Sequence, residues 1–467
     1  MWIKNKHNGY TVRCIPAIGG GLYRCTIQHH FDPCTDKWNQ EDLESLQPGA
    51  TVVPLVVSTD KMQLTIFGGK MAYPVYMTIR NIPKEIHWKL SCHAQMLIGY
   101  IPTSKLESIR NKAAHCHALT NLFHFCLQTI LAPIVLPGKT GLPMMSGDGI
   151  WCQCHPILAN FIGDYPEQVL VTCTYYGECP KCKVPHDQLG DSNRFLAHDY
   201  RKALEIYALA DGNVCMFCAA CKDNGIKPVF HPFLELLLLA NMYVSITPDI
   251  LHQLLQGVMK HLIAWLSDPL VFGPQRIDVQ CCLMPPNHQI ALFPKGISIL
   301  AQVSGKEHKN ICRILLGLIV NLQLSNGSSL VCLFKAMCGL LNFLYLAQLP
   351  SQTTNTISCL EHSLVTFHEN KDIFVDLGVQ GQFNIPKIHS LIHYSSSIHL
   401  FGSTDNYNTE QTECLHIDFT KDAYCTTNYK DEYYQMTTWL ERCEKLQQHV
   451  TCIKWQQQHH LTTSVLP

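Results

Sequence analysis

The chain has 467 residues, of which 47% are hydrophobic, and its formal net charge at pH 7 is −1. This length suits two or three domains, and the hydrophobic content excludes a disordered chain. The most apolar run, residues 231–246, contains a glutamate and is shorter than a membrane span, and the first ten residues lack the apolar core of a signal peptide. We therefore expect an intracellular protein with a sizeable core and no membrane association.

Cysteine, histidine and arginine occur in unusual proportions. The chain has 24 cysteines and 25 histidines but only nine arginines, and charged residues make up 15% of it, against roughly 25% in ordinary domains. Disulfide frameworks belong to small secreted proteins, so most of these thiols should be reduced, and a minority should bind metal.

One genetic cause explains these proportions, because C-to-T changes convert arginine codons into codons for Cys, Trp, His or Gln. These four residues dominate the clusters "HWKLSCH" (87–93), "AAHCHA" (113–118) and "WCQCH" (151–155). The alternative is a genuine Cys/His-rich metal protein, but the irregular spacing of the clusters does not suit metal ligands. We interpret the clusters as former arginine-rich segments of a gene that has accumulated mutations, as silenced mobile elements do.

The first 83 residues predict an irregular lead-in followed by an antiparallel meander. Residues 1–50 show weak periodicity. The next segment contains three short runs typical of strands, separated by Asp-Lys and Gly-Gly turn signals, at 52–59, 62–67 and 73–79.

A helix and a further strand follow the meander. Residues 104–134 have helical spacing, with Ser104 as the cap, and residues 148–164 return to strand character. The first 170 residues thus predict the order β-β-β-α-β. The rest is predicted to be mainly helical, with a loop at 348–358 and helical segments at 233–265, 312–348, 356–370 and 409–447.

Two aspartates end predicted strands of this sheet. Asp60 follows the first strand in "VVSTDK", and Asp164 follows the last in "FIGDYPE". A third acid from the late helix, Glu410 or Glu413, would complete three oxygen donors able to hold two Mg²⁺ ions. Each aspartate alone could be an ordinary turn or cap residue. Asp148 is a competitor, but its flanking glycines indicate a turn.

Cys179 and Cys182 form the knuckle "ECPKC", which presents two thiols to one Zn²⁺. The remaining ligands could be His186, or Asp249 and His252, which lie three residues apart on one helical face. A structural zinc here would anchor the chain where it leaves the sheet. The alternative is a chance pair in a cysteine-rich chain.

Two other Cys/His patterns are weaker. "CMFCAAC" (215–221) lies in an alanine-rich helical context without a nearby histidine. His389 and His393 have i, i+4 spacing and could bind metal or phosphate, but satisfied core or surface histidines are the favoured interpretation.

Four linked motifs together resemble one known family. They are "DKMQLTIFGGKMAYPVYMTIRNIPKEI", "GDYPEQVLVTCTYYGECPKCKVPHDQLGD", "SITPDILHQLLQGVMKHLIAWL", and "FNIPKIHSLIHY" with "FGSTDNYNTEQTECLHIDFTKDAY". In this order, over roughly residues 45–450, they resemble the Plavaka-type transposases of mushroom-forming fungi. That family belongs with the Kyakuja–Dileera–Zisupton group and is related to the CACTA transposases.

The resemblance implies an α/β ribonuclease-H-like mixed sheet interrupted by a large helical insertion. It implies an Asp/Asp/Glu triad of Asp60, Asp164 and Glu413, with Glu410 as the backup, that binds Mg²⁺ or Mn²⁺. The thiol pair Cys179 and Cys182 matches the family's Cys-x-x-Cys. The later Asp-x-x-His motif matches Asp249 and His252, assigned to structural Zn²⁺ or its support.

The expected organisation has five parts. They are an irregular lead-in (1–50), the first part of the core (51–172), the zinc knuckle and helical insertion (173–400), the helical part of the core with the third acid (401–450) and a tail (451–467).

The expected activity is cut-and-paste DNA transposition in the nucleus by a homo-oligomer that binds element ends and target DNA. The chain departs from the family at residue 414, which is Cys where arginine is expected. Lost arginines remove phosphate contacts, so this copy is expected to be of low activity. A non-catalytic, zinc-containing DNA- or protein-binding remnant is the main alternative, and an unrelated metal-dependent nuclease is a weaker one.

Overall fold

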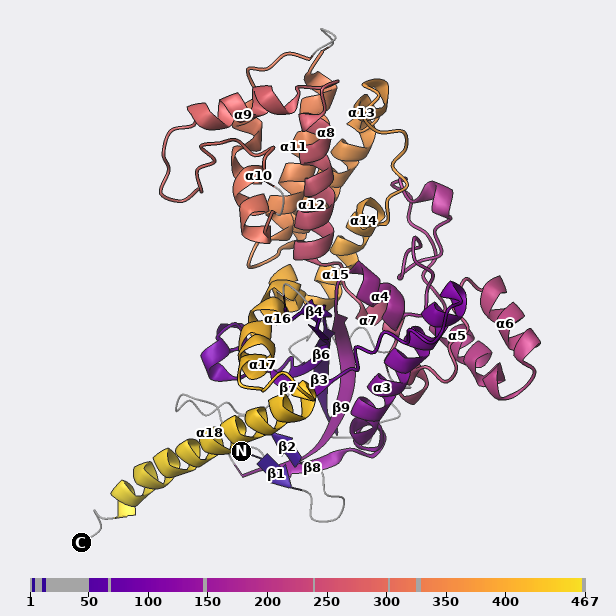
Figure 1. Cartoon of the computed structure of the whole chain (residues 1–467), viewed down its shortest axis with the longest axis vertical. Coiled ribbons are helices and arrows are strands. Elements are labelled where there is room, and N and C mark those ends of the chain that lie inside the picture. Colours follow the sequence, from indigo (N-terminus) through magenta and orange to yellow (C-terminus); the bar gives the residue numbers. More distant parts are fainter. Residues whose placement is uncertain are drawn as a thin grey trace.

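The computed structural model describes residues 2–4, 11–13, 50–65, 69–145, 149–237, 240–300, 303–324 and 329–463, with side chains only between residues 50 and 457. Its centre is a curled five-stranded mixed sheet in the order β7-β6-β3-β9-β8 (Figure 1). The strands are β3 (Ala50–Thr59), β6 (Pro74–Ile79), β7 (Met96–Tyr100), β8 (Leu142–Met145) and β9 (Trp151–Ile162).

The middle pair, β3 and β9, is parallel, and the other neighbours are antiparallel. A parallel pair needs a long crossover, which here contains α3 (Lys112–Thr140). The valine-rich sequence of β3 suits a strand that is covered on both faces. Leu55 and Val57 pack into one hydrophobic cluster, whereas Val56 packs into another.

Helix α3 covers one face of the sheet, where Phe123, Leu127 and Leu131 share a cluster with Leu55 and Val57. It is the one helix in the described part of the chain that is long and apolar enough to cross a membrane by length and composition. Those three side chains pack against the sheet instead.

The sequence-based boundaries of this helix were wrong by several residues. The side chain of Asn111, rather than Ser104, accepts hydrogen bonds from the first free N–H groups, those of Ala113 and Ala114.

The predicted strand order lacked two strands, β7 and β8, which are short and have weak alternation. The run predicted at 62–67 also differs. Met62–Gln63 (β4) pairs with Met71–Ala72 (β5) in a separate two-stranded sheet. The mixed α/β class was therefore predicted correctly, but the number of strands was not.

The opposite face of the sheet is covered by helices from the C-terminal part of the chain. Phe401 of α15 (Tyr394–Phe401) and Tyr407 pack on Val56 and Ile162. Helix α16 (Thr409–His416) lies against β3 and continues into the π-helix η9 (Ile417–Asp422), as Figure 1 shows. The sheet therefore lies between two helical layers. Beyond it, α18 (Glu432–Thr463) projects from the body.

A second hydrophobic core lies in a helical bundle at the other end of the molecule (Figure 1). It contains α8 (Lys260–Ser267), α10 (Gly305–Ile319), α11 (Val331–Ala347) and α12 (Thr354–Asn370). The single helix predicted over 233–265 is instead broken into η5 (Phe233–Leu236), α7 (Met242–Ser245), the π-helix η6 (Ile250–Met259) and α8. Further elements are β1 (Trp2–Lys4), β2 (Thr11–Arg13), α2 (Lys84–His87), α4 (Tyr165–Val171), α5 (Tyr200–Tyr207), α6 (Val214–Asp223), α9 (Pro274–Leu283), α13 (Ile373–Asp376), α14 (Pro386–His389) and α17 (Ala423–Cys425).

Candidate active site

Two aspartates meet at the carboxyl ends of the central parallel strands. Ser58 of β3 is the register partner of Ile162 of β9, and each of these two residues is followed two positions later by an aspartate, Asp60 or Asp164. Parallel neighbours end at the same edge of a sheet, so the pairing places the two acids side by side. Asp164 is also the N-cap of α4, where its side chain accepts a hydrogen bond from the Glu167 N–H at 3.0 Å.

Helix α16 and the π-helix η6 complete this edge. Nε2 of His252 lies 3.1 Å from Oε1 of Glu413. One donor atom each from Asp60, His252 and Glu413 lies within 4.8 Å of the other two. These three residues come from distant parts of the chain. Asp164, whose carboxylate caps α4, lies at the same edge but outside that 4.8 Å group, and the four residues together are called the acid centre below.

The electrostatics of the acid centre are unusual. Burial raises the pKa of Asp60 to about 6 against the opposing charge of His252, with further raising contributions from the carboxylates of Asp164, Glu413 and Asp249. Burial alone would lower the pKa of His252, but Glu413, Asp249 and Asp164 outweigh it and raise the pKa to about 9. His252 is therefore a cation at neutral pH. Crowded oxygen donors of negative charge are suited to a hard divalent cation.

Asp249 has an organising position beside the acid centre. It is 1% exposed, and its carboxylate accepts hydrogen bonds from the N–H of His252 and from the N–H and hydroxyl of Thr409. Thr409 begins the helix that carries Glu413. Asp249 thus connects the two elements that supply His252 and Glu413, and its oxygens are engaged by hydrogen-bond donors.

Two buried glutamine side chains, which sequence reasoning did not identify, link the segment around Asp249 to the residue before Asp164. Nε2 of Gln168 donates to the carbonyls of Gly163 (2.9 Å) and Thr247 (2.8 Å). Nε2 of Gln253 donates to Oε1 of Gln168 at 2.9 Å. The sequence signal was two glutamines inside otherwise apolar helical stretches.

Glu167 was also missed, although it lies three residues after Asp164. It is buried and accepts hydrogen bonds from the hydroxyls of Thr59 (2.8 Å) and Tyr73 (2.5 Å). Burial raises the pKa of Glu167 to about 8, against the opposing effect of these two hydrogen bonds. The residue joins the end of β3 to the start of α4, the two places that carry Asp60 and Asp164.

Of the two other candidate acids, the structure describes only Glu410. Glu410, the alternative third acid, has its carboxylate 2.5 Å from Nζ of Lys309 and 3.0 Å from Nδ2 of Asn408. Its neighbour Glu413 is the one that contacts His252. Asp148 lies outside the described residues.

The thiol pair of the knuckle has two histidine partners. Sγ of Cys179 lies 3.2 Å from Nε2 of His393, and Sγ of Cys182 lies 3.1 Å from Nε2 of His389. All four donor atoms lie within 4.8 Å of one another. Two sulfur and two nitrogen donors at this spacing could hold one metal ion. We call these four residues the Cys/His centre.

The Cys/His centre is largely buried, and the pKa of each thiol depends on the neighbouring ligands. Burial acts to raise the pKa of Cys179, but hydrogen bonds with Cys182, His389 and His393 and the charge of His393 hold that pKa well below its usual range. Burial also lowers the pKa of His393. The hydrogen bond with Cys179 and burial raise the pKa of Cys182 instead, so a metal ion bound by both thiols would have to displace that proton.

The residues that the structure places around the two thiols therefore differ from the partners predicted from the sequence. Asp249 and His252 lie at the acid centre, and His186 is exposed. His389 and His393, favoured as satisfied histidines, face the thiols. Among the cysteines of "CMFCAAC", Cys215 and Cys218 are exposed. None of that segment belongs to a metal-type cluster in the described residues.

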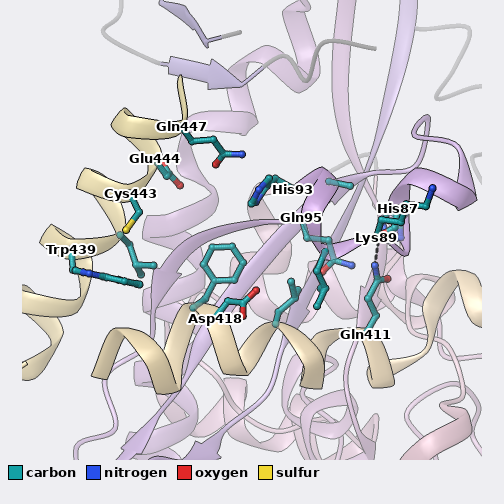
Figure 2. Close-up of a pocket in the computed structure, with 15 residues that line it drawn as sticks. His87, Lys89, His93, Gln95, Gln411, Asp418, Trp439, Cys443, Glu444 and Gln447 are labelled. Carbon is teal, nitrogen blue, oxygen red and sulfur yellow. Dashed lines mark hydrogen bonds between the residues drawn. The ribbon is translucent and has the colours of Figure 1, made fainter. Parts of the chain in front are cut away.

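A pocket of about 140 Å³ lies beside α16 (Figure 2). Gln411 of α16 lines it together with Trp439 of α18 and with His93 and Gln95 from the segment before β7. Residues two apart on an α-helix point about 200° apart, so Gln411 and Glu413 face opposite sides. The pocket lining includes no residue of either centre.

Comparison with known proteins agrees with the resemblance found in the sequence. No curated protein matches the chain. The sequence pattern of the Plavaka transposase family matches residues 24–266, which is more than half of the chain. The matched part includes Asp60, Asp164, the thiol pair and the Asp249–His252 motif. The chain therefore belongs to the Plavaka transposase family.

Proposed function

We propose that this chain is a DNA transposase of the cut-and-paste Asp/Asp/Glu type. The observation that carries the proposal is the parallel register of β3 and β9, which places Asp60 and Asp164 at one edge, where α16 adds Glu413. The order β7-β6-β3-β9, with one parallel pair beside two antiparallel ones, supports a ribonuclease-H-like core.

The three carboxylates are the proposed holders of two Mg²⁺ or Mn²⁺ ions. When bound, such ions activate a water or 3′-hydroxyl and stabilise both oxygens of an in-line phosphoryl displacement. The strand ends fix Asp60 and Asp164, whereas Glu413 reaches in from a helix. His252 supplies a counter-charge that pairs with Glu413 in the absence of metal.

The Cys/His centre is the proposed site of a structural Zn²⁺. It joins the knuckle after α4 to His389 at the end of α14 and to His393 directly before α15, about 210 residues later in the chain. The donor set supports zinc rather than magnesium, because thiolates and imidazoles are the ligands that zinc prefers. We further propose action in the nucleus, on element ends and target DNA, by a homo-oligomer.

The test is Mg²⁺-dependent cleavage of DNA that carries the element's own ends. It compares the wild type, the Asp164→Ala variant, and a form in which Cys116, His117 and Cys414 are returned to Arg. We expect the arginine form to cut best and Asp164→Ala to abolish cutting in that background.

Asp199→Ala is the matched control for this assay. Asp199 caps α5 and accepts a hydrogen bond from the Lys202 N–H at 3.0 Å, as Asp164 does from Glu167 in α4. The control therefore loses an equivalent helix-capping hydrogen bond while the acid centre is unchanged, and it should still cleave DNA. Equal losses in both variants would assign Asp164 a purely structural role and refute the triad.

A non-catalytic, DNA- or protein-binding remnant is the second candidate. The observation in its favour is the net charge of −1, which is poor for a protein that binds a polyanion. If every form is folded and binds zinc at the Cys/His centre but none cuts, this function replaces the first.

A further inference from the structure

Three residues that lie close to the Cys/His ligands in the sequence donate hydrogen bonds to the segment that carries Asp249 and His252. The first is Lys181, between the two thiols of the knuckle. Its Nζ donates hydrogen bonds to the carbonyls of Ile246 (2.5 Å) and Val244 (3.4 Å). The knuckle thus holds the backbone just before Asp249.

The two histidine ligands are accompanied by the other two donors. Lys387, two residues before His389, donates from Nζ to the carbonyl of His252 at 3.0 Å. Tyr394, directly after His393, is fully buried and donates from its hydroxyl to the carbonyl of Asp249 at 2.8 Å. Segments on both sides of the Cys/His centre therefore bind one stretch of backbone, residues 244–252.

The backbone around residues 244–252 has two local features that suit these donors. The carbonyl of Asp249 also accepts the Leu254 N–H at 3.2 Å, an i→i+5 bond of the π-helix, and such turns are frequent at functional sites. At Gly257, an added Cβ would lie 2.5 Å from Cδ of Lys387. Glycine at this position leaves the space through which Lys387 reaches His252.

We propose that the Cys/His centre positions the acid centre. Metal bound by the four ligands fixes the knuckle against α14 and α15, and Lys181, Lys387 and Tyr394 then hold the backbone that orients Asp249 and His252. The three donors are positioning residues, because they act through that backbone. The inference rests on the proposed metal-binding role of the acid centre.

The test measures Mn²⁺ affinity at the acid centre by electron paramagnetic resonance in the full chain, with Co²⁺ occupying the Cys/His centre as a spectroscopic reporter. The variants are Tyr394→Phe, which removes an uncharged donor, and Gly257→Ala, which displaces the charged donor Lys387. Both leave every proposed metal ligand in place. We expect about fivefold weaker Mn²⁺ binding, as for one lost hydrogen bond, with an unchanged Co²⁺ spectrum.

Matched controls separate this effect from general destabilisation. Tyr200→Phe removes a buried hydroxyl that donates to the Leu234 carbonyl at 2.9 Å, and Gly317→Ala adds a methyl group where no atom lies within 4 Å. Both controls should bind Mn²⁺ as the wild type does, whatever their unfolding temperatures.

Two outcomes distinguish the possible failures. If Asp164→Ala loses Mn²⁺ binding but Tyr394→Phe and Gly257→Ala bind Mn²⁺ like the controls, the positioning role is refuted and the proposed function stands. If Asp60→Asn, Asp164→Ala and Glu413→Gln all bind Mn²⁺ as the wild type does, the acid centre is not a metal site and both proposals fail.

Discussion

At the scale of single residues, the acid centre is a place where folding and function oppose each other. Asp60 is half-buried among other carboxylates, and its pKa is raised to about 6 from the ordinary 3.8. A raised pKa of an acid means that its ionised form is less favourable in the folded protein than in the unfolded chain. The stability contributed by Asp60 is therefore present below pH 3.8 and lost as the pH rises through 6.

This predicts that Asp60→Asn stabilises the metal-free protein at neutral pH. The difference between the two pKa values corresponds to about 3 kcal/mol at most, gained between pH 4 and pH 6. Chemical denaturation of both proteins at pH 4 and pH 7.5 measures it. Added Mg²⁺ should stabilise only the wild type, and a difference that does not change with pH would contradict the assignment.

The two neighbouring glutamates of α16 predict a second contrast. Glu413→Gln removes the carboxylate that faces His252 and Asp60, so we expect at least a tenfold loss of Mn²⁺ affinity. Glu410→Gln removes a partly exposed pair with Lys309, of the kind worth no more than about 1 kcal/mol. Its Mn²⁺ affinity should stay within about twofold of the wild type. The reverse order would make Glu410 the third acid.

At the scale of elements, the central observation is that secondary structures distant in the chain meet at two centres. A parallel strand pair supplies two acids, and two helices that include π-helical turns supply Glu413 and His252. The knuckle supplies the two thiols of the second centre, and a pair of histidines about 210 residues further along the chain supplies its two nitrogens. Loss of a ligand at either centre should therefore weaken contacts between elements that are far apart in the sequence.

This predicts that Cys182→Ser lowers the unfolding temperature and removes the thiolate-to-Co²⁺ charge-transfer absorption of one sulfur. A structural metal site contributes to folding because binding is coupled to the folded arrangement of its ligands. The control is Cys218→Ser, since Cys218 is exposed on α6 outside the centre. Equal spectra for Cys182→Ser and the wild type would exclude the thiol as a ligand.

Element boundaries show what local patterns reveal. The valine-rich β3 has a strong local signal and was predicted well, whereas the helix α4 that Asp164 caps was not predicted. The broken helix at 233–267 was predicted as one piece, because its apolar periodicity continues through the breaks. The short strand β7 has no alternation of its own, since it depends on pairing with β6.

At the scale of the whole molecule, the cysteines fall into two groups. Cys116 and Cys414 are exposed, as expected for positions that once carried arginine. Cys154 and His155 of "WCQCH" are buried in the sheet, where an arginine would need a partner. The hypothesis of lost arginines therefore suits the exposed cysteines better than the buried cluster.

This predicts that Cys414→Arg together with Cys116→Arg strengthens DNA binding. Each arginine that contacts a phosphate should steepen the dependence of log K on log salt by about 0.9, because one more counterion is released. Titration of duplex DNA at several salt concentrations measures the slope. Cys425→Arg, at another exposed cysteine, is the control for charge alone. An equal gain from the control would show a general charge effect.

The sequence by itself determined the family, the acids at the strand ends, the thiol pair and the mixed α/β class, because each depends on short stretches whose residue types and spacing carry the chemistry. The tertiary structure alone decided which partners each one has. It placed His389 and His393 opposite the thiols and Asp249 and His252 at the acid centre, and it separated Glu413 from Glu410. These pairings depend on how a strand pair, two π-helical segments and α14 pack across hundreds of residues. Packing over such distances is set by shape and burial, which no local pattern records.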